Sequence, residues 1–311
     1  MPGEATRRRY SAVFISPHLD DAVFSCGGAI ARLRQQGQVL VINLFTQYLA
    51  DLKIHGAVLG AERYREEEAA ARFLDFESLN LGELDAPFRR ESYRQLGNLF
   101  RLPVQQDIDW LPTLRARLLA LLSEIEFEHL YVPLGIGWHV DHVLSHQVFD
   151  CWAGEGRLLY YEDAPYCCIP HATRYRLNDI AVCPEQTGDR SLASADALQA
   201  WRQAATAYAN TALMKNLQPW IVRKFAVPTV SFYLFRLMAQ HRHQAIRAVK
   251  RRLQSKVVPI TDEFERKVDA MGLYRSQFGE FFASRQDCCT TLKTYGCAMG
   301  EPTGMVERFW F

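Results

Sequence analysis

The chain has 311 residues, of which 49% are hydrophobic and 23% charged, and its formal net charge is +1. This is the composition of an ordinary soluble globular protein, long enough for one large domain or for a domain with a substantial insertion. The eight cysteines include no C-x-x-C pair, which excludes a zinc ribbon and argues against a regular disulfide framework. No apolar stretch typical of a signal peptide follows the arginines near the N-terminus, so we expect a reducing, cytoplasmic setting.

The first part of the chain alternates between expected strands and helices. Residues 12–16 form a short apolar run typical of a buried parallel strand, and a helical pattern after Gly27-Gly28 leads to a second apolar run at 39–45. The alternation continues with expected helices at 61–73, 111–125 and 142–152 and expected strands at 78–81, 129–133 and 157–161. This order predicts an α/β fold, with a Rossmann-like, mostly parallel sheet and helices on both faces.

Two parts of one domain are predicted, a catalytic core over residues 1–190 and a mainly helical C-terminal part over residues 191–311. The second part contains a basic insertion, because residues 197–261 include eleven Lys or Arg and no Asp or Glu. Three interpretations of this insertion stay open. It pairs with acidic residues elsewhere, or it contacts the inner face of a membrane through residues 215–256, or it forms a groove for an anionic substrate. Its apolar run is too short to span a bilayer, which takes about 20 residues, and no motif for nucleic-acid binding accompanies the charge.

Two His/Asp clusters follow expected strands and carry the chemistry of the chain. The first is Ser16-Pro17-His18-Leu19-Asp20-Asp21 and the second is Trp138-His139-Val140-Asp141-His142. Ligands of open parallel sheets bind beyond the carboxyl ends of the strands, so we expect the two clusters to meet there. Catalytic zinc takes about three protein ligands from His, Asp, Glu or Cys and leaves one position for water. The clusters supply such a set with groups left over for proton transfer, which predicts a hydrolase site.

The residues alone leave alternatives open at these clusters. An Asp after a strand is also a common helix cap, and Asp141 could simply orient an imidazole. His142 and His146 are four residues apart and could form a metal pair of the zincin type, although no Glu follows His142. The default interpretation of His146 is a surface histidine.

The motif Pro17-His18-Leu19-Asp20-Asp21, followed by Gly27-Gly28 and by His139-Val140-Asp141-His142, resembles the PIG-L/LmbE-like family of zinc-dependent N-deacetylases. The resemblance covers roughly residues 11–165 and extends to Lys267 and to residues 274–277. The chain departs from the family pattern at Ala22, where an acidic residue is usual, and this departure bears on the substrate more than on the metal.

The resemblance implies roles for individual residues. One Zn²⁺ per chain is implied, with His18, Asp21 and His142 as its ligands. Asp20 is implied as the general base that takes a proton from the attacking water. His139, with Asp141 beside it in the motif, is implied to stabilise the oxyanion or to protonate the leaving amine.

Four further residues are predicted to bind the substrate: Arg63, Asp85, Glu162 and Asp163. Each has a structural alternative. The helix that carries Arg63, Glu66, Glu67 and Glu68 is more typical of a solvated charged face, and Asp85 could be a turn residue. Glu162 or Asp163 could cap a helix or pair with Arg157.

The predicted activity is hydrolysis of an N-acyl group, expected to be N-acetyl, from an amino-sugar conjugate, giving a free amine and acetate. The expected partner is a small molecule or glycoconjugate, with an anionic or lipid-linked carrier left open, and no nucleic acid. Two alternatives remain. One is a metal-dependent phosphoesterase, which would usually need a second metal about 3.5–4 Å away. The other is a non-catalytic membrane-docking or binding protein on the same scaffold.

Overall fold

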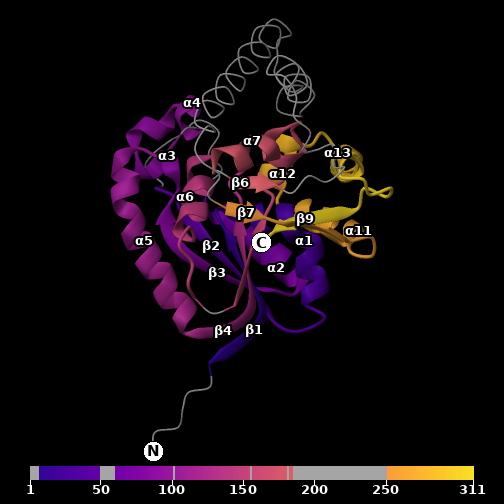
Figure 1. Ribbon diagram of the computed structural model, residues 1–311, viewed down its shortest axis with the longest axis horizontal. Helices are drawn as coiled ribbons and strands as arrows, with labels where there is room; N and C mark the ends of the chain where they lie inside the picture. The colour runs from indigo at the N-terminus through magenta and orange to yellow at the C-terminus, as the bar shows by residue number, and fades with distance from the viewer. Residues whose placement is uncertain (1–6, 50–59, 101, 155, 181, 185–250) are drawn as a thin grey trace, which may run out of the picture.

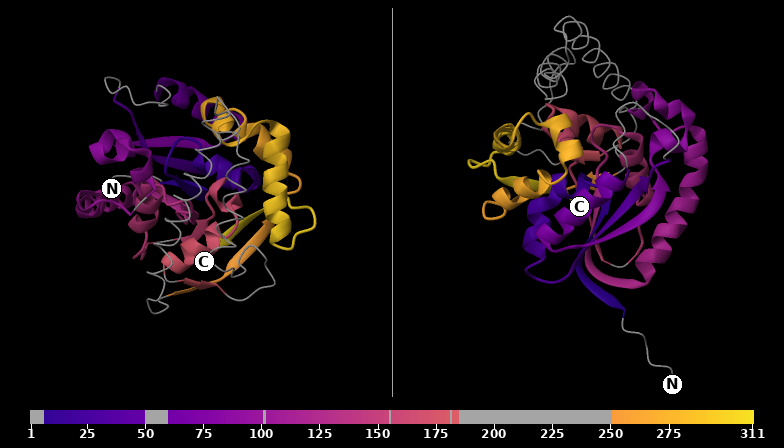
Figure 2. Two further views of the ribbon diagram at one scale, coloured as in Figure 1. Left: turned by 90° about the horizontal axis from the view of Figure 1, so that it is seen from above. Right: turned by 180° about the vertical axis from the view of Figure 1, so that it is seen from behind.

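A computed structural model describes residues 7–49, 60–100, 102–154, 156–180, 182–184 and 251–311. In this part of the chain a seven-stranded sheet lies between two layers of helices (Figures 1 and 2). The strands are β1 (Arg8–Ser16), β2 (Val39–Gln47), β3 (Glu77–Leu84), β4 (Ile125–Pro133), β5 (Arg157–Tyr161), β6 (Val182–Pro184), β7 (Arg251–Leu253), β8 (Ser255–Pro259) and β9 (Val306–Trp310). The helices are α1 (Asp21–Leu33), α2 (Gly60–Leu74), α3 (Ala86–Arg89), α4 (Leu96–Leu99), α5 (Gln105–Ser123), α6 (Val140–Val148), α7 (Ala172–Asp179), α11 (Phe264–Met271), α12 (Arg275–Phe281) and α13 (Arg285–Ala298), with short 3₁₀ helices η1 (Glu91–Arg94) and η2 (Tyr166–Cys168).

The strand order of the large sheet is β3-β2-β1-β4-β5-β9-β8. Strands β1 to β5 pair in parallel, β9 is antiparallel to β5, and β8 is antiparallel to β9. A separate pair, β6 and β7, is also parallel. The predicted mostly parallel α/β fold is therefore confirmed.

The two faces of the sheet bury different sets of side chains. Along β1, Val13 and Ile15 pack into a core shared with α5 and α6, whereas Ala12 and Phe14 pack into a core shared with α1, α2 and α11. Successive side chains of a strand point to opposite faces, so a strand covered on both faces is apolar throughout. This double burial explains why β1 and β2 read as continuous apolar runs in the sequence.

The C-terminal part shares the sheet of the N-terminal part, because β8 and β9 extend it beyond β5. Helices α11 and α13 pack in the same core as α1. The predicted boundary near residue 190 and the basic insertion stay predictions, because residues 185–250 lie outside the described part; of the basic segment only residues 251–261 are described. None of the helices in the described ranges combines the length and the apolar character that crossing a membrane requires.

Helix α1 is interrupted near its middle, where Cys26 has a non-helical φ of −126°. The backbone N–H groups of Gly28 and Ala29 donate to the two carboxylate oxygens of Glu307, each at 2.9 Å. Lys267 Nζ donates both to Ser25 O at 3.0 Å and to Glu307 Oε1 at 2.8 Å. A buried ion pair from the C-terminal part thus satisfies the backbone groups that the kink releases, as buried polar groups require.

The Gly27-Gly28 pair allows this close approach. A Cβ atom on Gly28 would lie 2.7 Å from Ile260 Cδ1, and one on Gly27 would lie 3.0 Å from Lys267 Cγ. Any side chain at these positions would therefore push the C-terminal segment away from α1. The N-terminal half of α1 begins at Asp21, so the packing at the kink supports the segment that carries the first His/Asp cluster.

Candidate metal centre

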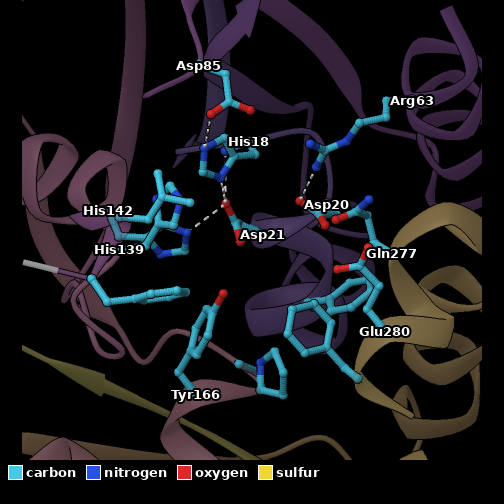
Figure 3. A pocket seen from close by; sticks show the side chains of 16 residues that line it. His18, Asp20, Asp21, Arg63, Asp85, His139, His142, Tyr166, Gln277 and Glu280 are labelled. Atoms are coloured by element: carbon cyan, nitrogen blue, oxygen red, sulfur yellow. Dashed lines mark hydrogen bonds and ion pairs between the residues drawn. The ribbon is translucent and has the colours of Figure 1, made fainter. Parts of the chain in front are cut away.

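The residues of both His/Asp clusters lie at the carboxyl ends of neighbouring parallel strands. His18, Asp20 and Asp21 follow β1, and His139 and His142 follow β4. The strand order reverses direction between β1 and β4, which is where open α/β sheets bind their ligands. Figure 3 shows the side chains converging on one pocket, together with Asp85 after β3.

The first cluster sits on a tight turn between β1 and α1. Ser16 Oγ donates to His18 O at 2.6 Å and accepts from Ala22 N at 3.0 Å. Asp20 has a backbone φ of 151°, a conformation that side chains rarely adopt and that is found preferentially at functional sites. The turn directs the adjacent Asp20 and Asp21 side chains to different partners, so that each can have a separate function.

Two imidazole nitrogens of the predicted ligands lie close to the carboxylate of the third. Asp21 Oδ2 lies 3.1 Å from His18 Nδ1 and 3.2 Å from His142 Nε2. Ligand atoms bound to a tetrahedral zinc at about 2.0–2.1 Å lie about 3.3 Å from one another. The two separations from Asp21 are close to this value. In the described part of the chain, possible ligand atoms also lie within 4.8 Å of one another in two groups, His18 with His139 and His142, and His18 with Asp85 and Asp141.

A second carboxylate holds the far nitrogen of each imidazole. His18 Nε2 lies 3.1 Å from Asp141 Oδ2, and His142 Nδ1 lies 2.8 Å from Asp163 Oδ1. When these nitrogens donate to the carboxylates, His18 Nδ1 and His142 Nε2 can present lone pairs to a cation bound beside Asp21 Oδ2, in place of the ring protons that would otherwise bond to this oxygen. Carboxylate–histidine pairs of this kind are typical of metal ligands.

The ionisation of the imidazoles leads to the same conclusion. Burial lowers the pKa of His18, but the hydrogen bonds to Asp141 and Asp21 outweigh it, and the pKa stays well above its usual range. Burial is likewise outweighed at His142, where the Asp21 charge and the Asp163 hydrogen bond raise the pKa to about 9. The surrounding carboxylates therefore favour positive charge at this point, and a divalent cation fits the donor set.

Asp163 and Glu162 do not line the pocket, contrary to their predicted role in substrate binding. Besides holding His142, Asp163 accepts from Gly135 N and Ile136 N, both at 2.8 Å. Glu162 is buried among Tyr295, Arg308 and Trp310, each of which donates to its carboxylate. Asp163 thus positions an imidazole, and Glu162 joins β5 to the C-terminal strands.

Replacing Asp163 with Asn is expected to weaken metal binding about 10- to 100-fold, the usual effect of losing such a partner. The amide cannot accept from all three N–H donors that meet the carboxylate, so the His142 ring loses its orientation. Competition with a chelator of known affinity measures the change. Asp109→Asn removes an exposed carboxylate of α5 and serves as the control; equal affinities of the two variants would contradict this role.

Asp20 faces the pocket beside the predicted ligands and is paired with an arginine. Arg63 Nη2 lies 3.2 Å from Asp20 Oδ1 and 3.3 Å from Leu19 O. Burial raises the pKa of Asp20 to about 7, with the Arg63 charge acting against it and the Asp21 charge adding to it. A carboxylate in this range can take a proton near neutral pH.

His139 also faces the pocket, but in a neutral form. Its Nδ1 accepts from Asp141 N at 3.3 Å, as the N-cap of α6. Burial lowers the pKa of His139 to about 3, and the neighbouring His18 acts in the same direction. The proton of the neutral ring is therefore on Nε2. His139 therefore presents a neutral N–H donor to the pocket.

Asp141 does not line the pocket and forms part of a charged chain that the sequence did not reveal. Besides His18, Asp141 accepts from Arg89 Nη2 at 2.6 Å and from Ala86 N at 3.0 Å. Arg89 also pairs with the buried Asp107 at 3.2 Å. Burial opposes ionisation of Asp141, but Arg89 and the bond from His18 outweigh it and hold the pKa well below its usual range. Asp141 therefore orients His18, and no local pattern around Arg89 or Asp107 indicated this.

The charged face of α2 is mostly buried, so the solvated interpretation is wrong for Arg63, Glu66 and Glu67 and right only for Glu68. Glu66 accepts from Ser276 N at 2.8 Å and from Ser276 Oγ at 2.6 Å, and Glu67 accepts from Tyr274 OH at 2.6 Å. These bonds bring α12 against the pocket. The predicted surface position of His146 is also wrong: it is 3% exposed, and its Nδ1 lies 3.1 Å from Pro133 O.

The pocket has a volume of about 190 Å³. Arg63 and Asp85, two of the four predicted substrate residues, line it. Three further polar side chains of the wall were not predicted as site residues, Tyr166 from η2 and Gln277 and Glu280 from α12 (Figure 3). Tyr166 lies next to His142, with ring centroids 5.8 Å apart.

Comparison with known proteins identifies the family that this part of the chain resembles. Residues 13–152 match the family model described as PIG-L: GlcNAc-PI de-N-acetylase, which confirms the predicted resemblance. Two proteins named 2'-N-acetylparomamine deacetylase, from Streptomyces fradiae and Niallia circulans, are each 29% identical to the chain. The matches cover 51% and 50% of this chain and 58% and 66% of the two relatives, so the chain spans less than two thirds of their length.

A solved structure extends the likeness in fold to nearly the whole chain. The crystal structure of a deacetylase from the teicoplanin biosynthesis pathway superimposes with a TM-score of 0.62 at 16% identity, over 97% of this chain and 96% of that one. At this identity the likeness concerns the fold alone.

Proposed function

We propose that the protein is a metal-dependent N-deacetylase that removes an N-acetyl group from an amino-sugar conjugate. The observation that carries the proposal is the convergence of His18 Nδ1, Asp21 Oδ2 and His142 Nε2, with Asp20 and His139 beside them in one pocket. The match of residues 13–152 to a de-N-acetylase family and the names of the two curated relatives support the same reaction class.

The metal we propose is one Zn²⁺ per chain, held by His18, Asp21 and His142. When bound, zinc supplies a Lewis acid and lowers the pKa of water to about 7. Other divalent ions compete for the same donors, because affinity order alone does not select the metal. The choice of zinc rests on the tetrahedral spacing of one carboxylate and two imidazoles.

The side chains then divide the proton transfers of amide hydrolysis. Asp20, held by Arg63, takes the proton of the attacking water and so increases its nucleophilicity. The Nε2–H of His139 donates to the developing oxyanion and stabilises it. The proton on Asp20 passes to the nitrogen of the leaving amine as the C–N bond breaks, which gives acetate and a free amine.

Substrate binding is assigned to Arg63 and Asp85, which line the same pocket. Arg63 lies beside the predicted base Asp20, and Asp85 lies near the predicted ligand His18. Burial raises the pKa of Asp85, with the charges of His18 and Arg63 acting against the shift. A desolvated carboxylate next to the reacting centre is suited to accept a hydrogen bond from a sugar hydroxyl.

The phosphoesterase alternative needs a second metal. Besides the group that contains His139 and His142, the described residues offer one further group of possible ligands, and it is poorly suited to hold a second metal. This group is His18, Asp85 and Asp141, and it shares His18 with the first site. Asp141 already accepts from Arg89 and Ala86, so its lone pairs are engaged.

The direct test measures acetate and free amine released from a panel of N-acetyl amino sugars and their glycosides. The full chain is assayed with Zn²⁺, Co²⁺ or Ni²⁺ supplied, and again after a chelator. We expect acetate and amine in equal amounts, only with metal present. Cleavage of phosphate esters with two metals per chain would favour the phosphoesterase. Failure to release acetate from any member of the panel would contradict the proposal.

A further inference from the structure

One wall of the pocket comes from the C-terminal part of the chain. Gln277, Glu280 and Phe281 of α12 line it, and Gln277 and Glu280 lie on the side away from His139 and His142 (Figure 3). The hydrogen bonds from Ser276 to Glu66 and from Tyr274 to Glu67 fix α12 against α2. The wall is therefore a built part of the pocket.

Glu280 brings an unmatched negative charge to this wall. Among the described residues its carboxylate has no hydrogen bond or ion pair, whereas Asp20 nearby is paired with Arg63 (Figure 3). Glu280 lines the pocket but is exposed to solvent, and the surrounding protein atoms raise the pKa of its carboxyl group, with the Arg63 charge acting in the opposite direction. Arg63 itself is engaged by Asp20 and Leu19 and lies over the Tyr48 ring, 5.7 Å from its centroid. The carboxylate thus lacks a cation that the pocket could supply.

Aromatic rings surround the same wall. Phe281 packs edge-to-face against two other rings. Its ring centroid lies 6.4 Å from that of Phe24 and 5.9 Å from that of Tyr166. All three residues line the pocket. Ring faces attract cations within about 6 Å, and a carboxylate supplies the charge-assisted hydrogen bond. Together they have the chemistry that binds an ammonium group.

From this combination we propose that Glu280 is a specificity-determining residue that selects substrates carrying a second, protonated amine on the group attached to the N-acetyl sugar. The inference rests on the proposed deacetylase function and deepens it by naming the substrate class. A cationic carrier pairs with Glu280 and packs on Phe24 and Phe281. An anionic carrier instead meets the carboxylates of Asp85 and Glu280 and is repelled, which argues against the phosphate-bearing substrates left open by the sequence.

The first test measures binding without turnover, so that it does not depend on the deacetylase reaction. The probes are the 2-aminoethyl and 2-hydroxyethyl glycosides of N-methylsulfonyl-glucosamine, in which a sulfonamide replaces the cleavable amide. Calorimetry with the full chain is expected to show about tenfold tighter binding of the aminoethyl glycoside. Glu280→Gln is expected to abolish this preference and Glu280→Lys to reverse it, whereas Glu124→Gln, which removes an exposed charge after α5, should retain it.

The second test measures acetate release from the matching N-acetyl glycosides by the metal-supplied protein. The expected result is a ratio of kcat/KM values, aminoethyl over hydroxyethyl, that falls about tenfold in Glu280→Gln, mainly through KM. Equal binding of the two probes to the wild type, binding of neither, or a preference that survives in Glu280→Gln would overturn the role of Glu280. Selective binding without acetate release from either glycoside would support the subsite and count against the deacetylase reaction alone.

Discussion

His142→Ala is expected to abolish both metal retention and acetate release. The wild-type chain should retain about one metal ion, because three donors converge and both imidazoles are held by carboxylates. Without the His142 ring, Asp21 Oδ2 keeps one imidazole nitrogen beside it, His18 Nδ1 at 3.1 Å, and the Asp163 carboxylate loses its ring partner. Metal analysis after gel filtration, together with the acetate assay, measures both consequences.

The matched control is His146→Gln, one turn further along α6. His146 is buried and has its Nδ1 3.1 Å from Pro133 O, a contact that the Gln amide can retain. This variant should keep its metal and its activity. Loss of metal from His146→Gln, with retention in His142→Ala, would move the centre to a different set of ligands. Circular dichroism of both variants shows whether the fold is intact.

Asp20→Asn is expected to separate catalysis from metal binding. We expect kcat to fall about 10²- to 10⁴-fold, the usual contribution of a general base, with the metal content unchanged. The amide has nearly the same shape and its oxygen can still accept from Arg63, so the turn after β1 should persist. What it lacks is the capacity to take a proton from water.

The control for Asp20→Asn is Asp85→Asn, which alters a second pocket carboxylate with no assigned role in proton transfer. We expect Asp85→Asn to act mainly on KM, because the lost interaction is one with the bound sugar. Equal losses of kcat in the two variants would remove the distinction between base and binding residue. A loss of metal in Asp20→Asn would show that Asp20 is itself a ligand.

The strands and the position of the site could be predicted because both depend on local sequence. Strands buried on two faces give apolar runs such as residues 39–45, and polar residues directly after such strands stand out against them. The placement of His18, Asp21 and His142 next to one another followed from parallel pairing of β1 and β4. In these regions the pattern of apolar residues in the sequence matches the burial of their side chains in the structure.

Long-range pairing explains what could not be predicted. Glu66 and Glu67 have the spacing of a solvated helix face, and their partners Ser276 and Tyr274 are more than 200 residues away in the sequence. Asp163 follows a strand as a substrate-binding residue would, but the turn after β4 directs two backbone N–H groups at its carboxylate. Partners of this kind depend on tertiary packing, which a charge pattern does not contain.

The kink in α1 also has a consequence for the order in which the protein assembles. Residues 13–152, which contain both His/Asp clusters, leave the ribosome before the C-terminal part that carries Glu307. The amides of Gly28 and Ala29 nevertheless find their acceptor only in Glu307, 279 and 278 residues later. Contacts of such sequence separation form late in folding. The segment that starts at Asp21 therefore gains its final support only after β9 has been made and inserted between β5 and β8, and the site matures after translation of almost all of the described chain.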